Sequence, residues 1–325
     1  MSTPLRLGIA GLGTVGIGVV KIVQTHGALL ARRSGRPVEI VAVSANSRSK
    51  NRGADISAYG WEDDPVQLAR REDVDVVVEL IGGENGVAKA LVETALKNGK
   101  DVVTANKALL AKHGTALARL AEDKGRSLRF EAAVAGGIPV IKALTEGLAG
   151  NQIKRVMGVM NGTCNYILTR MESAGLPYDE VFEEARKLGY LEADPNLDVG
   201  GIDAGHKLSL LSAIAFGTEV DFDNVVLQGI GSVSIADIRL ARDMGYAIKL
   251  LGVAQMTGRG LEQRMTPCLV PETHPLGQLQ GGTNMVVIEG DMVGQIVLRG
   301  AGAGEGPTAS AVMGDVIDIA RGFHL

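Results

Sequence analysis

The sequence predicts an α/β protein, with a parallel sheet flanked by helices in the first part of the chain and a second domain of α+β type. Three observations support this. Short β-rich runs alternate with helix-like stretches up to about residue 130. A glycine-rich turn directly follows the first apolar run. Beyond residue 130 the alternation stops, and 325 residues exceed what one hydrophobic core usually serves. We therefore expect a first domain over 1–130 and a second over 131–302.

Each element of the first domain is predicted from composition and periodicity. The short apolar runs predicted to be strands are Leu5–Ala10, Val38–Val43, Val74–Leu80 and Asp101–Val103. The stretches with helical spacing follow the glycine turn through Val23 and cover Val87–Lys97 and Ala108–Ala121. Strands that alternate with helices in this way favour right-handed crossovers and hence a parallel sheet.

The second domain has a different order of elements. Its predicted helices are Pro139–Leu148, Tyr178–Leu188 and Asp203–Phe216, and its predicted strands are Ile248–Ala254, Met285–Glu289 and Gln295–Leu298. A last helix over Thr308–Ala320 follows Pro307, a residue typical of a first helical turn. We expect the C-terminal segment 303–325 to return to the first domain and complete it.

Composition narrows the classes of function. The formal net charge is −4, with 33 basic and 37 acidic residues spread along the chain, so nucleic acid is not an expected partner. The two cysteines are too few for a disulfide framework and fit a reducing compartment, which makes the cytoplasm the expected location. No apolar run approaches the roughly 18 residues of a membrane span, so no membrane is expected either.

The glycine turn predicts a dinucleotide site. Gly11, Gly13 and Gly16 follow the first strand, and Thr14 and Val15 would open the helix whose N-terminal amides face an anion. This is the fingerprint of a Rossmann-type dinucleotide-binding domain, in which glycines permit a tight turn and close approach to a pyrophosphate. The alternative is a purely structural turn, because the chain holds 44 glycines.

The loop after the second strand bears on the choice of coenzyme. In NAD-specific sites an acid at this position commonly binds the ribose hydroxyls, but residues 44–50 read SANSRSK and contain none. Arg48 and Lys50 could neutralise a 2′-phosphate, which favours NADP, with NAD as the alternative. A basic loop that is merely solvated would also have this composition.

The stretch from Ala185 to Lys207 holds an unusual set of charges just before an apolar helix. Asp203 and Lys207 are four residues apart, so they share one helical face and can hold each other in position. A surface ion pair is the simplest interpretation. However, the residues after Lys207 are almost all apolar, and a buried ion pair needs compensation or a function.

This stretch resembles the signature of homoserine dehydrogenases. The matching positions are Ala185, Gly189, Tyr190, Asp194, Pro195, Asp198, Gly201, Asp203 and Lys207, and Leu191 departs from the small residue of the family pattern. Segments 104–107, 131–139, 161–166 and 302–304 agree with the same family. The resemblance implies an NAD(P)H-dependent reduction of L-aspartate 4-semialdehyde to L-homoserine, in the biosynthesis of threonine, methionine and isoleucine.

The resemblance also implies roles for individual residues. Lys207 would donate the proton to the developing alkoxide, and Asp203 would orient Lys207 or a bridging water. Lys107, placed after a strand where it can reach cofactor and substrate, is the second candidate catalytic lysine. Glu192 would bind the substrate's α-ammonium group, with Asp198 in the same polar pocket.

Further implications concern ligands and assembly. Beside the glycine turn, the residues expected at the coenzyme are Gly82, Thr104, Lys107, Gly189 and Gly304. A monovalent cation such as sodium would bind main-chain carbonyls at Glu131, Val134, Gly136 and Ile138. The second domain would be catalytic and would form a homodimer, and the C-terminal amino-acid-binding regulatory domain of many members is not expected. The five histidines show no paired metal-ligand spacing: His26, His113, His206, His274 and His324.

Two alternatives of other classes stay open on the sequence. Cys164 could be the nucleophile of a phosphorylating semialdehyde dehydrogenase, with His206 or His274 as the base. A nucleotide-sensing Rossmann module would carry the same glycine fingerprint without catalysis.

Overall fold

The structure, a computed structural model, describes residues 3–191 and 194–323. The chain divides into two compact units. The first unit comprises Met1–Pro139 and Ala303–Leu325, and the second comprises Val140–Gly302. The C-terminal segment thus belongs to the first unit, and the chain passes into the second unit at Pro139 rather than near residue 130.

The first unit is built on a six-stranded parallel sheet. Its strands are β1 (Leu5–Ala10), β2 (Val38–Ser44), β3 (Gly60–Glu62), β4 (Val76–Glu79), β5 (Asp101–Thr104) and β6 (Leu128–Arg129). Their order is β3-β2-β1-β4-β5-β6, and every neighbouring pair is parallel. This is the doubly wound Rossmann order, in which ligands bind at the carboxyl ends of the strands where the order reverses, here between β1 and β4.

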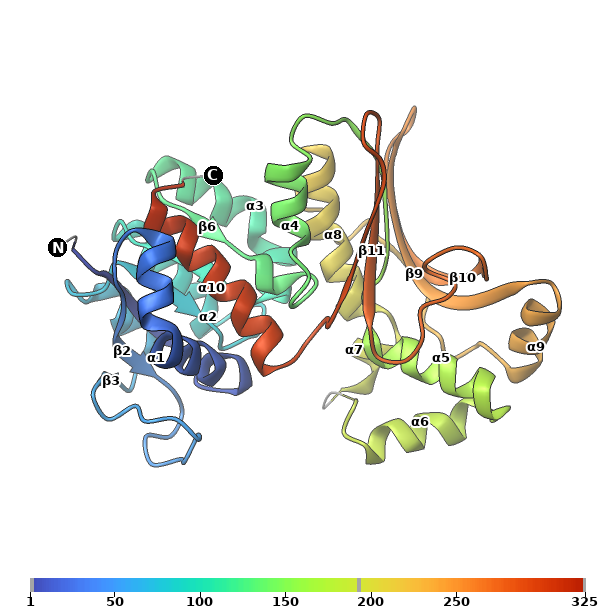
Figure 1. Ribbon diagram of the computed structural model, residues 1–325, viewed down its shortest axis with the longest axis horizontal. Helices are drawn as coiled ribbons and strands as arrows, with labels where there is room; N and C mark the ends of the chain where they lie inside the picture. The colour runs from blue at the N-terminus through green and yellow to red at the C-terminus, as the bar shows by residue number, and fades with distance from the viewer. Residues whose placement is uncertain (1–2, 192–193, 324–325) are drawn as a thin grey trace. The chain divides into compact units, whose positions relative to one another are not determined.

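Helices cover both faces of this sheet (Figure 1). They are α1 (Thr14–Ser34), α2 (Val87–Lys97), α3 (Lys107–Asp123) and α10 (Glu305–Arg321), with short helical turns η1 (Pro65–Arg70) and η2 (Glu131–Ala133). Side chains of α1 and α10 form one apolar core with the sheet, and those of α2 and α3 form the other. A Cβ at Gly18 would lie 2.9 Å from the Ala309 Cβ, so a glycine in α1 lets α1 and α10 pack closely.

Helix α1 runs well beyond Val23, where the apolar pattern of the sequence fades. Among the described residues it is the one helix that is long and apolar enough to cross a membrane, judged by length and composition alone. In the fold its buried residues, among them Val19 and Val20, belong to the core that it forms with α10 and the sheet. These contacts are those of a core helix of a Rossmann unit.

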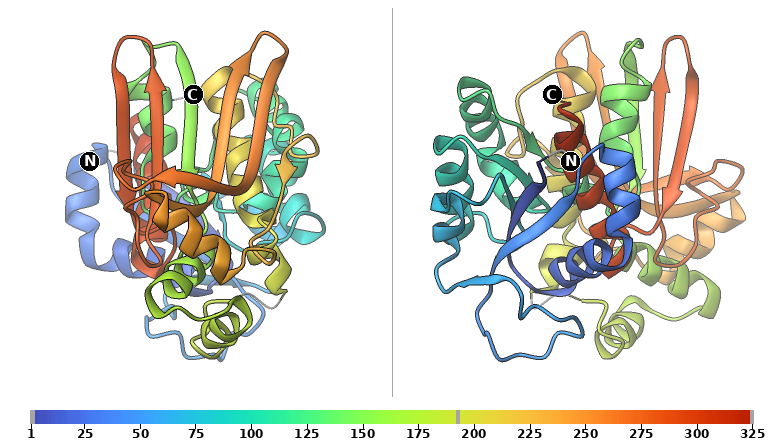
Figure 2. Two further views of the ribbon diagram at one scale, coloured as in Figure 1. Left: turned by 90° about the vertical axis from the view of Figure 1, so that its right-hand side faces the viewer. Right: turned by 60° about the vertical axis from the view of Figure 1, so that its left-hand side comes forward.

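The second unit holds a largely antiparallel six-stranded sheet, whose strands lie side by side in the left view of Figure 2. The strands are β7 (Ile153–Val159), β8 (Val226–Leu227), β9 (Tyr246–Thr257), β10 (Gly260–Pro271), β11 (Asn284–Gly290) and β12 (Gly294–Gly300), in the order β12-β11-β7-β9-β10-β8. Within the described part of this second sheet, β8 and β10 pair in parallel and the other neighbouring strands pair antiparallel. The helical segments are α4 (Val140–Lys142), η3 (Ala143–Gly147), α5 (Gly162–Ala174), α6 (Tyr178–Lys187), α7 (Pro195–Val199), α8 (Ile202–Phe216) and α9 (Ile235–Asp243). Helix α8 packs against β7, β9 and β10.

The predicted fold class is confirmed, with local differences. The structure adds β7, β8, β10, α5, α7 and α9 to the predicted elements of the second unit. Strand β10 has Arg264 at an exposed position and contains Pro267, so it lacks the apolar run that marks a buried strand. Strand β7 has a buried apolar run over 156–159, but the exposed Lys154 and Arg155 interrupt its start. The expected helix Pro139–Leu148 is one α-helical turn followed by a π-helical turn.

Candidate active site

The glycine turn between β1 and α1 is shaped by two contacts within the protein and one open position. Gly11 has φ +97°, and a Cβ there would overlap the Leu80 carbonyl, while a Cβ on Gly16 would overlap the Gly11 carbonyl. A Cβ on Gly13 would meet no atom within 4 Å. Gly13 is the N-cap of α1, directly before Thr14 and Val15. The turn therefore leaves backbone amides open at a helix N-terminus, which fits the pyrophosphate of a dinucleotide.

A buried carboxylate joins the loop after β4 to the neighbouring strand β5. Glu79 ends β4 with none of its surface exposed. Its Oε1 accepts from the backbone N–H groups of Ile81 (2.8 Å) and Gly82 (3.1 Å), and its Oε2 accepts from the Thr104 hydroxyl (2.6 Å). The Asn106 Nδ2 donates to the Gly83 carbonyl at 2.8 Å. The loop after β4 is thus held both by Glu79 at the end of β4 and by Asn106, the N-cap of α3.

Glu79 was not among the residues singled out from the sequence. The available signal was one acid at the end of an otherwise apolar strand, Val-Val-Val-Glu. The predicted coenzyme residues Gly82 and Thr104 belong to this network, and Lys107 follows it as the first residue of α3. The sequence analysis therefore identified Gly82 and Thr104, which bind the carboxylate, but not Glu79, which carries it.

The loop after β2 carries the basic residues expected there. The guanidinium carbons of Arg48 and Arg52 each lie 6.0 Å from the centre of the Trp61 ring. Arg52 also donates to the backbone carbonyls of Lys50 (2.9 Å) and Ser47. Two cations on one indole make this a positively charged surface beside the carboxyl ends of β2 and β3.

The remaining predicted coenzyme residues lie in both units. Gly304, with φ +120°, is the N-cap of α10 in the first unit. Gly189, with φ +73°, follows the end of α6 in the second unit. Both are glycines in backbone conformations that other residues rarely adopt.

Lys207 and Asp203 form a mostly buried pair at the start of α8. The Lys207 Nζ lies 2.7 Å from the Asp203 Oδ2, and the side chains are only 12% and 8% exposed. The same ammonium donates to the Met160 carbonyl at 2.9 Å. The pair is therefore not a solvated surface ion pair, and its ammonium is oriented by a carboxylate and a carbonyl.

Asp198 lies in the same unit, in α7, and is buried. The Asn161 Nδ2 donates to its Oδ1 at 3.0 Å, and the Cys164 thiol donates to its backbone carbonyl at 3.3 Å. Glu192, the residue predicted to bind the substrate's ammonium group, falls outside the described residues.

The cysteine alternative is wrong. Cys164 is fully buried at the start of α5, and this burial, reinforced by the Asp198 charge, raises the pKa of its thiol far above the ordinary value. A nucleophilic cysteine needs the opposite, a stabilised and accessible thiolate. Of its two suggested bases, His206 packs on the Phe222 ring and the His274 Nδ1 accepts from the Leu276 N–H. Cys164 is a small apolar side chain of the core.

The segment predicted to bind a cation is a buried turn of the first unit. Glu131 lies in η2 and its N–H donates to the Asp315 Oδ2 of α10 at 2.9 Å. Val134 and Ile138 are buried, and Gly136 has φ +57°. In the part of the chain that the structure describes, no three His, Cys, Asp or Glu side chains are grouped as metal ligands.

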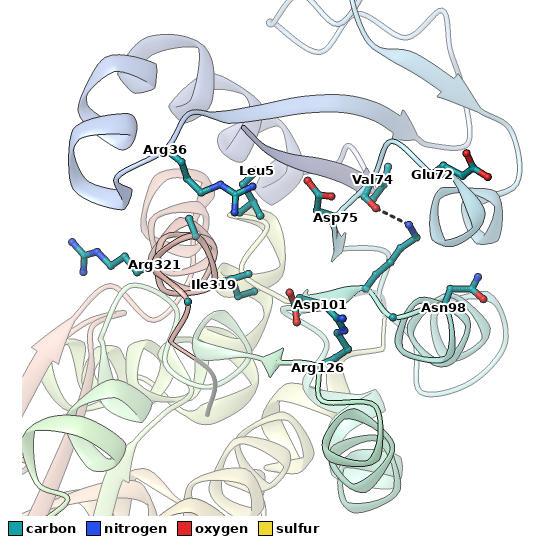
Figure 3. A pocket seen from close by; sticks show the side chains of 14 residues that line it. Leu5, Arg36, Glu72, Val74, Asp75, Asn98, Asp101, Arg126, Ile319 and Arg321 are labelled. Carbon is teal, nitrogen blue, oxygen red and sulfur yellow. Dashed lines mark hydrogen bonds between the residues drawn. The ribbon is translucent and has the colours of Figure 1, made fainter. Parts of the chain in front are cut away.

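A polar pocket of about 570 Å³ lies at the opposite end of the parallel strands (Figure 3). It lies where strands begin, beside Leu5, Asp75 and Asp101, away from the glycine turn. Two of its charged groups bind other protein groups: Asp75 pairs with Arg6 at 2.8 Å, and the Lys100 Nζ donates to the Val74 carbonyl at 2.6 Å. Because dinucleotides bind at the carboxyl ends of the strands, this pocket is not part of the candidate site.

Comparison with known proteins identifies the family. Residues 139–317 match the model for homoserine dehydrogenase, and residues 11–131 match the model for the homoserine dehydrogenase NAD-binding domain. The homoserine dehydrogenase of Neisseria gonorrhoeae is 49% identical over 318 residues, which cover 98% of this chain and 73% of the relative. That of Bacillus subtilis is 41% identical, with coverage of 99% and 74%.

Solved structures agree with these sequence matches. A homoserine dehydrogenase from Thiobacillus denitrificans has a TM-score of 0.95 at 44% identity, covering 98% of this chain and 74% of that one. A hyperthermophilic archaeal homoserine dehydrogenase in complex with NADPH has a TM-score of 0.83 at 25% identity, with 99% of both chains covered. This chain belongs to the homoserine dehydrogenase family, the NAD(P)-dependent oxidoreductases that reduce L-aspartate 4-semialdehyde to L-homoserine.

Proposed function

We propose that Lys207 is the proton donor of this reduction and that Asp203 orients it. The observation that carries the proposal is the position of the Lys207 side chain, which is 12% exposed and whose ammonium group contacts both the Asp203 carboxylate and the Met160 carbonyl. An ammonium has three N–H donors. These two contacts use two of them, and we assign the third to the aldehyde oxygen of the substrate.

The chemistry explains why such a group is needed. NADPH, when bound, supplies the hydride for the aldehyde carbon. Negative charge then develops on the aldehyde oxygen, and a positioned cation that can also give up a proton stabilises it. Asp203 keeps the ammonium from rotating away, because a carboxylate one helical turn earlier holds it by a charge-assisted hydrogen bond.

Other residues would bind the amino-acid end of the substrate. We assign Glu192 to the α-ammonium group and Asp198 to the same polar pocket, and we assign Lys107 to substrate and coenzyme as a second catalytic lysine. Support for Asp198 comes from its burial in the unit that also holds Lys207. The second unit would accordingly be the catalytic domain, and the first would bind the coenzyme.

NADP is the coenzyme that we propose, with NAD as the weaker alternative. Supporting observations are the positive surface of Arg48 and Arg52 on Trp61 and the archaeal relative solved with NADPH. We assign the pyrophosphate to the glycine turn and to Thr14 and Val15, and the 2′-phosphate to Arg48 and Lys50. The ratio of kcat/KM for NADPH and NADH, measured in the wild type and in Arg48→Ala, tests this assignment, which fails if the ratio does not fall in the variant.

A monovalent cation such as sodium is proposed at the carbonyls of Glu131, Val134, Gly136 and Ile138. The supporting feature is a tight buried turn of backbone, because hard cations prefer oxygen ligands. Full activity in buffer free of sodium and potassium would contradict a required ion.

We further propose a homodimer formed through the second sheet. Strand register places Arg155, Glu289, Arg264 and Val297 on one face, and all but Glu289 are exposed. Charges of both signs with an apolar residue suit a self-complementary two-fold interface.

We also propose a cytoplasmic location and a place in threonine, methionine and isoleucine biosynthesis, with neither nucleic acid nor a membrane as a partner.

The test of proton donation is the substitution of Lys207. Lys207→Ala should lower kcat by about 10²- to 10⁴-fold, the usual contribution of a general acid. Asp203→Asn should lower kcat less, because the ammonium remains but is held less firmly. Glu93 and Lys97 form an exposed pair on α2 with the same spacing, so Lys97→Ala is a matched control that should leave kcat unchanged. A Lys207→Ala variant within about tenfold of wild type would refute the assignment.

A further inference from the structure

Asn161 binds Asp198, the residue that we assign to the polar pocket, and it directly follows Met160, which binds Lys207. It is 4% exposed and is the N-cap of α5, just after β7. Its Oδ1 accepts from the Cys164 N–H at 2.8 Å, and its Nδ2 donates to the Asp198 Oδ1 at 3.0 Å. The carbonyl of the preceding residue, Met160, accepts from Lys207 at 2.9 Å. The consecutive residues Met160 and Asn161 thus bind Lys207 and Asp198, respectively.

The chemistry of the amide explains why asparagine occupies this position. The N-cap bond commits the amide oxygen to the helix, which turns the NH2 group toward Asp198. A carboxylate that accepts a hydrogen bond is stabilised in its charged form. Aspartate could cap α5 equally well but has no donor for Asp198, and serine could cap it but is too short to reach.

The electrostatic surroundings make this donor important. The titratable groups that act on the Cys164 thiol here are Asp198 in α7 and both Asp203 and Lys207 in α8. Two carboxylates and one ammonium therefore share a buried region of the second unit. An added carboxylate in this region would compete for a proton, because two acids within hydrogen-bonding distance do not both ionise easily.

We propose that Asn161 is a positioning residue of the active site: anchored as the N-cap of α5, it orients the Asp198 carboxylate by a hydrogen bond from its amide NH2 group. The proposal rests on the proposed function of Lys207 and Asp198. It goes beyond helix capping, because it predicts effects on substrate binding and on pH dependence that the loss of a cap would not cause.

Asn161→Asp and Asn161→Ser separate the two roles of the side chain, because both keep an N-cap oxygen and both lose the donor to Asp198. In Asn161→Ser, KM for the semialdehyde should rise about tenfold or more, as expected for a lost hydrogen bond to a charged group, with a smaller change in kcat and an unchanged Kd for NADPH. In Asn161→Asp, the acidic limb of the pH profile of kcat/KM should also move to higher pH, because the paired carboxylates share a proton.

A control variant isolates the effect of capping. Ser234 caps α9 and is not part of the site. Ser234→Ala should lower the melting temperature while KM and the pH profile stay as in wild type. If Asn161→Asp does not fold, Asn161→Ser decides by KM alone. A KM within about twofold of wild type in Asn161→Ser, with an unmoved pH profile in any folded Asn161→Asp, would reduce Asn161 to a helix cap.

Failure of the proposed function has a different signature. If wild-type protein consumed no NADPH with aspartate semialdehyde, or if Lys207→Ala kept its activity, the assignment of Lys207 would fall before any Asn161 variant was compared. If Lys207→Ala is inactive and both Asn161 variants behave as wild type, only the positioning role is refuted.

Discussion

Cys164 gives the clearest contrast between a reactive group and a packing group at the scale of single residues. Its thiol is buried, donates to the Asp198 carbonyl, and has a raised pKa because burial disfavours the thiolate. Cys164→Ser can replace the same hydrogen bond and should change kcat by less than about threefold. Alkylation by iodoacetamide at pH 8 should modify Cys268, which is partly exposed, before Cys164. A Cys164→Ser variant without activity, but with normal NADPH binding, would contradict this interpretation.

The sequence could predict some residues of the site but not their partners. Asp203 and Lys207 are four residues apart, so their contact follows from helical geometry alone. The other contacts of the site join residues 47 positions apart, as in Lys207 with Met160, or 37 positions apart, as in Asp198 with Asn161. A backbone carbonyl leaves no mark in a sequence, and an asparagine before a helix predicts only a cap. Tertiary structure alone reveals these partners.

Glu79 shows how one buried side chain organises several elements. It ties the loop after β4 to β5 through the Ile81 and Gly82 amides and the Thr104 hydroxyl. In Glu79→Gln, an NH2 group would replace one acceptor oxygen and face a donor. We expect the Kd for NADPH to rise about tenfold or more, because a hydrogen bond to a charged group is lost.

The measurement for Glu79→Gln is a titration of NADPH fluorescence. Gln67→Glu, a change of the reverse kind at a half-buried position in η1, serves as the control and should leave Kd unchanged. An unaltered Kd in a folded Glu79→Gln variant would show that the loop keeps its shape without the carboxylate.

Elements with strong apolar patterns were predictable, and elements with mixed patterns were not. Strand β1 and helix α2 span the predicted residues, and α8 begins one residue before the predicted start. Strand β10 alternates exposed and buried positions and includes Pro267, which pairs with Leu250 inside the sheet. Its length depends on pairing with β9 rather than on local preference, and that is why the sequence did not predict it.

The acid stability of the whole molecule should depend on Asp75 in the first unit. Burial raises the pKa of Asp75, but hydrogen bonds from Arg6 lower it more, so the net pKa lies below the ordinary 3.8. A depressed carboxyl pKa contributes stability that is present above the unfolded pKa and lost as pH falls through the folded pKa. Asp75→Asn should therefore cost about 1 kcal/mol at pH 7, since the pair is one-third exposed.

Urea unfolding at several pH values measures this effect. The difference between wild type and Asp75→Asn should shrink below pH 4 and vanish when both states are protonated. A difference independent of pH from 7 to 3 would mean that Asp75 stabilises the fold by packing alone.

Assembly is the other prediction for the whole molecule. Arg264→Glu places a like charge beside Glu262 on the proposed dimer face of the second sheet. Sedimentation should then give a species near the 33.9 kDa of one chain, while wild type sediments at about twice that mass. Arg259→Glu, in the tight turn between β9 and β10, is the matched control and should stay dimeric. An Arg264→Glu variant that remains dimeric would place the interface elsewhere.

The topology of the first unit was predictable because its alternating strands and helices allow few connections. Right-handed crossovers between parallel strands lead to the observed order β3-β2-β1-β4-β5-β6. The second sheet is less constrained, because antiparallel strands can pair in many orders and the long strand β10 carries a weak pattern. The boundary at Pro139 likewise depends on which contacts form, not on a visible linker.

Chemical rescue of Lys207→Ala by a small primary amine tests the central claim most directly. The substitution removes an ammonium group beside Asp203 and the Met160 carbonyl, and ethylammonium ion supplied in solution can take its place there. If Lys207 donates the proton, NADPH oxidation by aspartate semialdehyde should recover about tenfold or more with rising amine concentration, and tetramethylammonium, which has no N–H, should give no recovery. No rescue by any amine, in a variant that is folded and binds NADPH, would contradict the account.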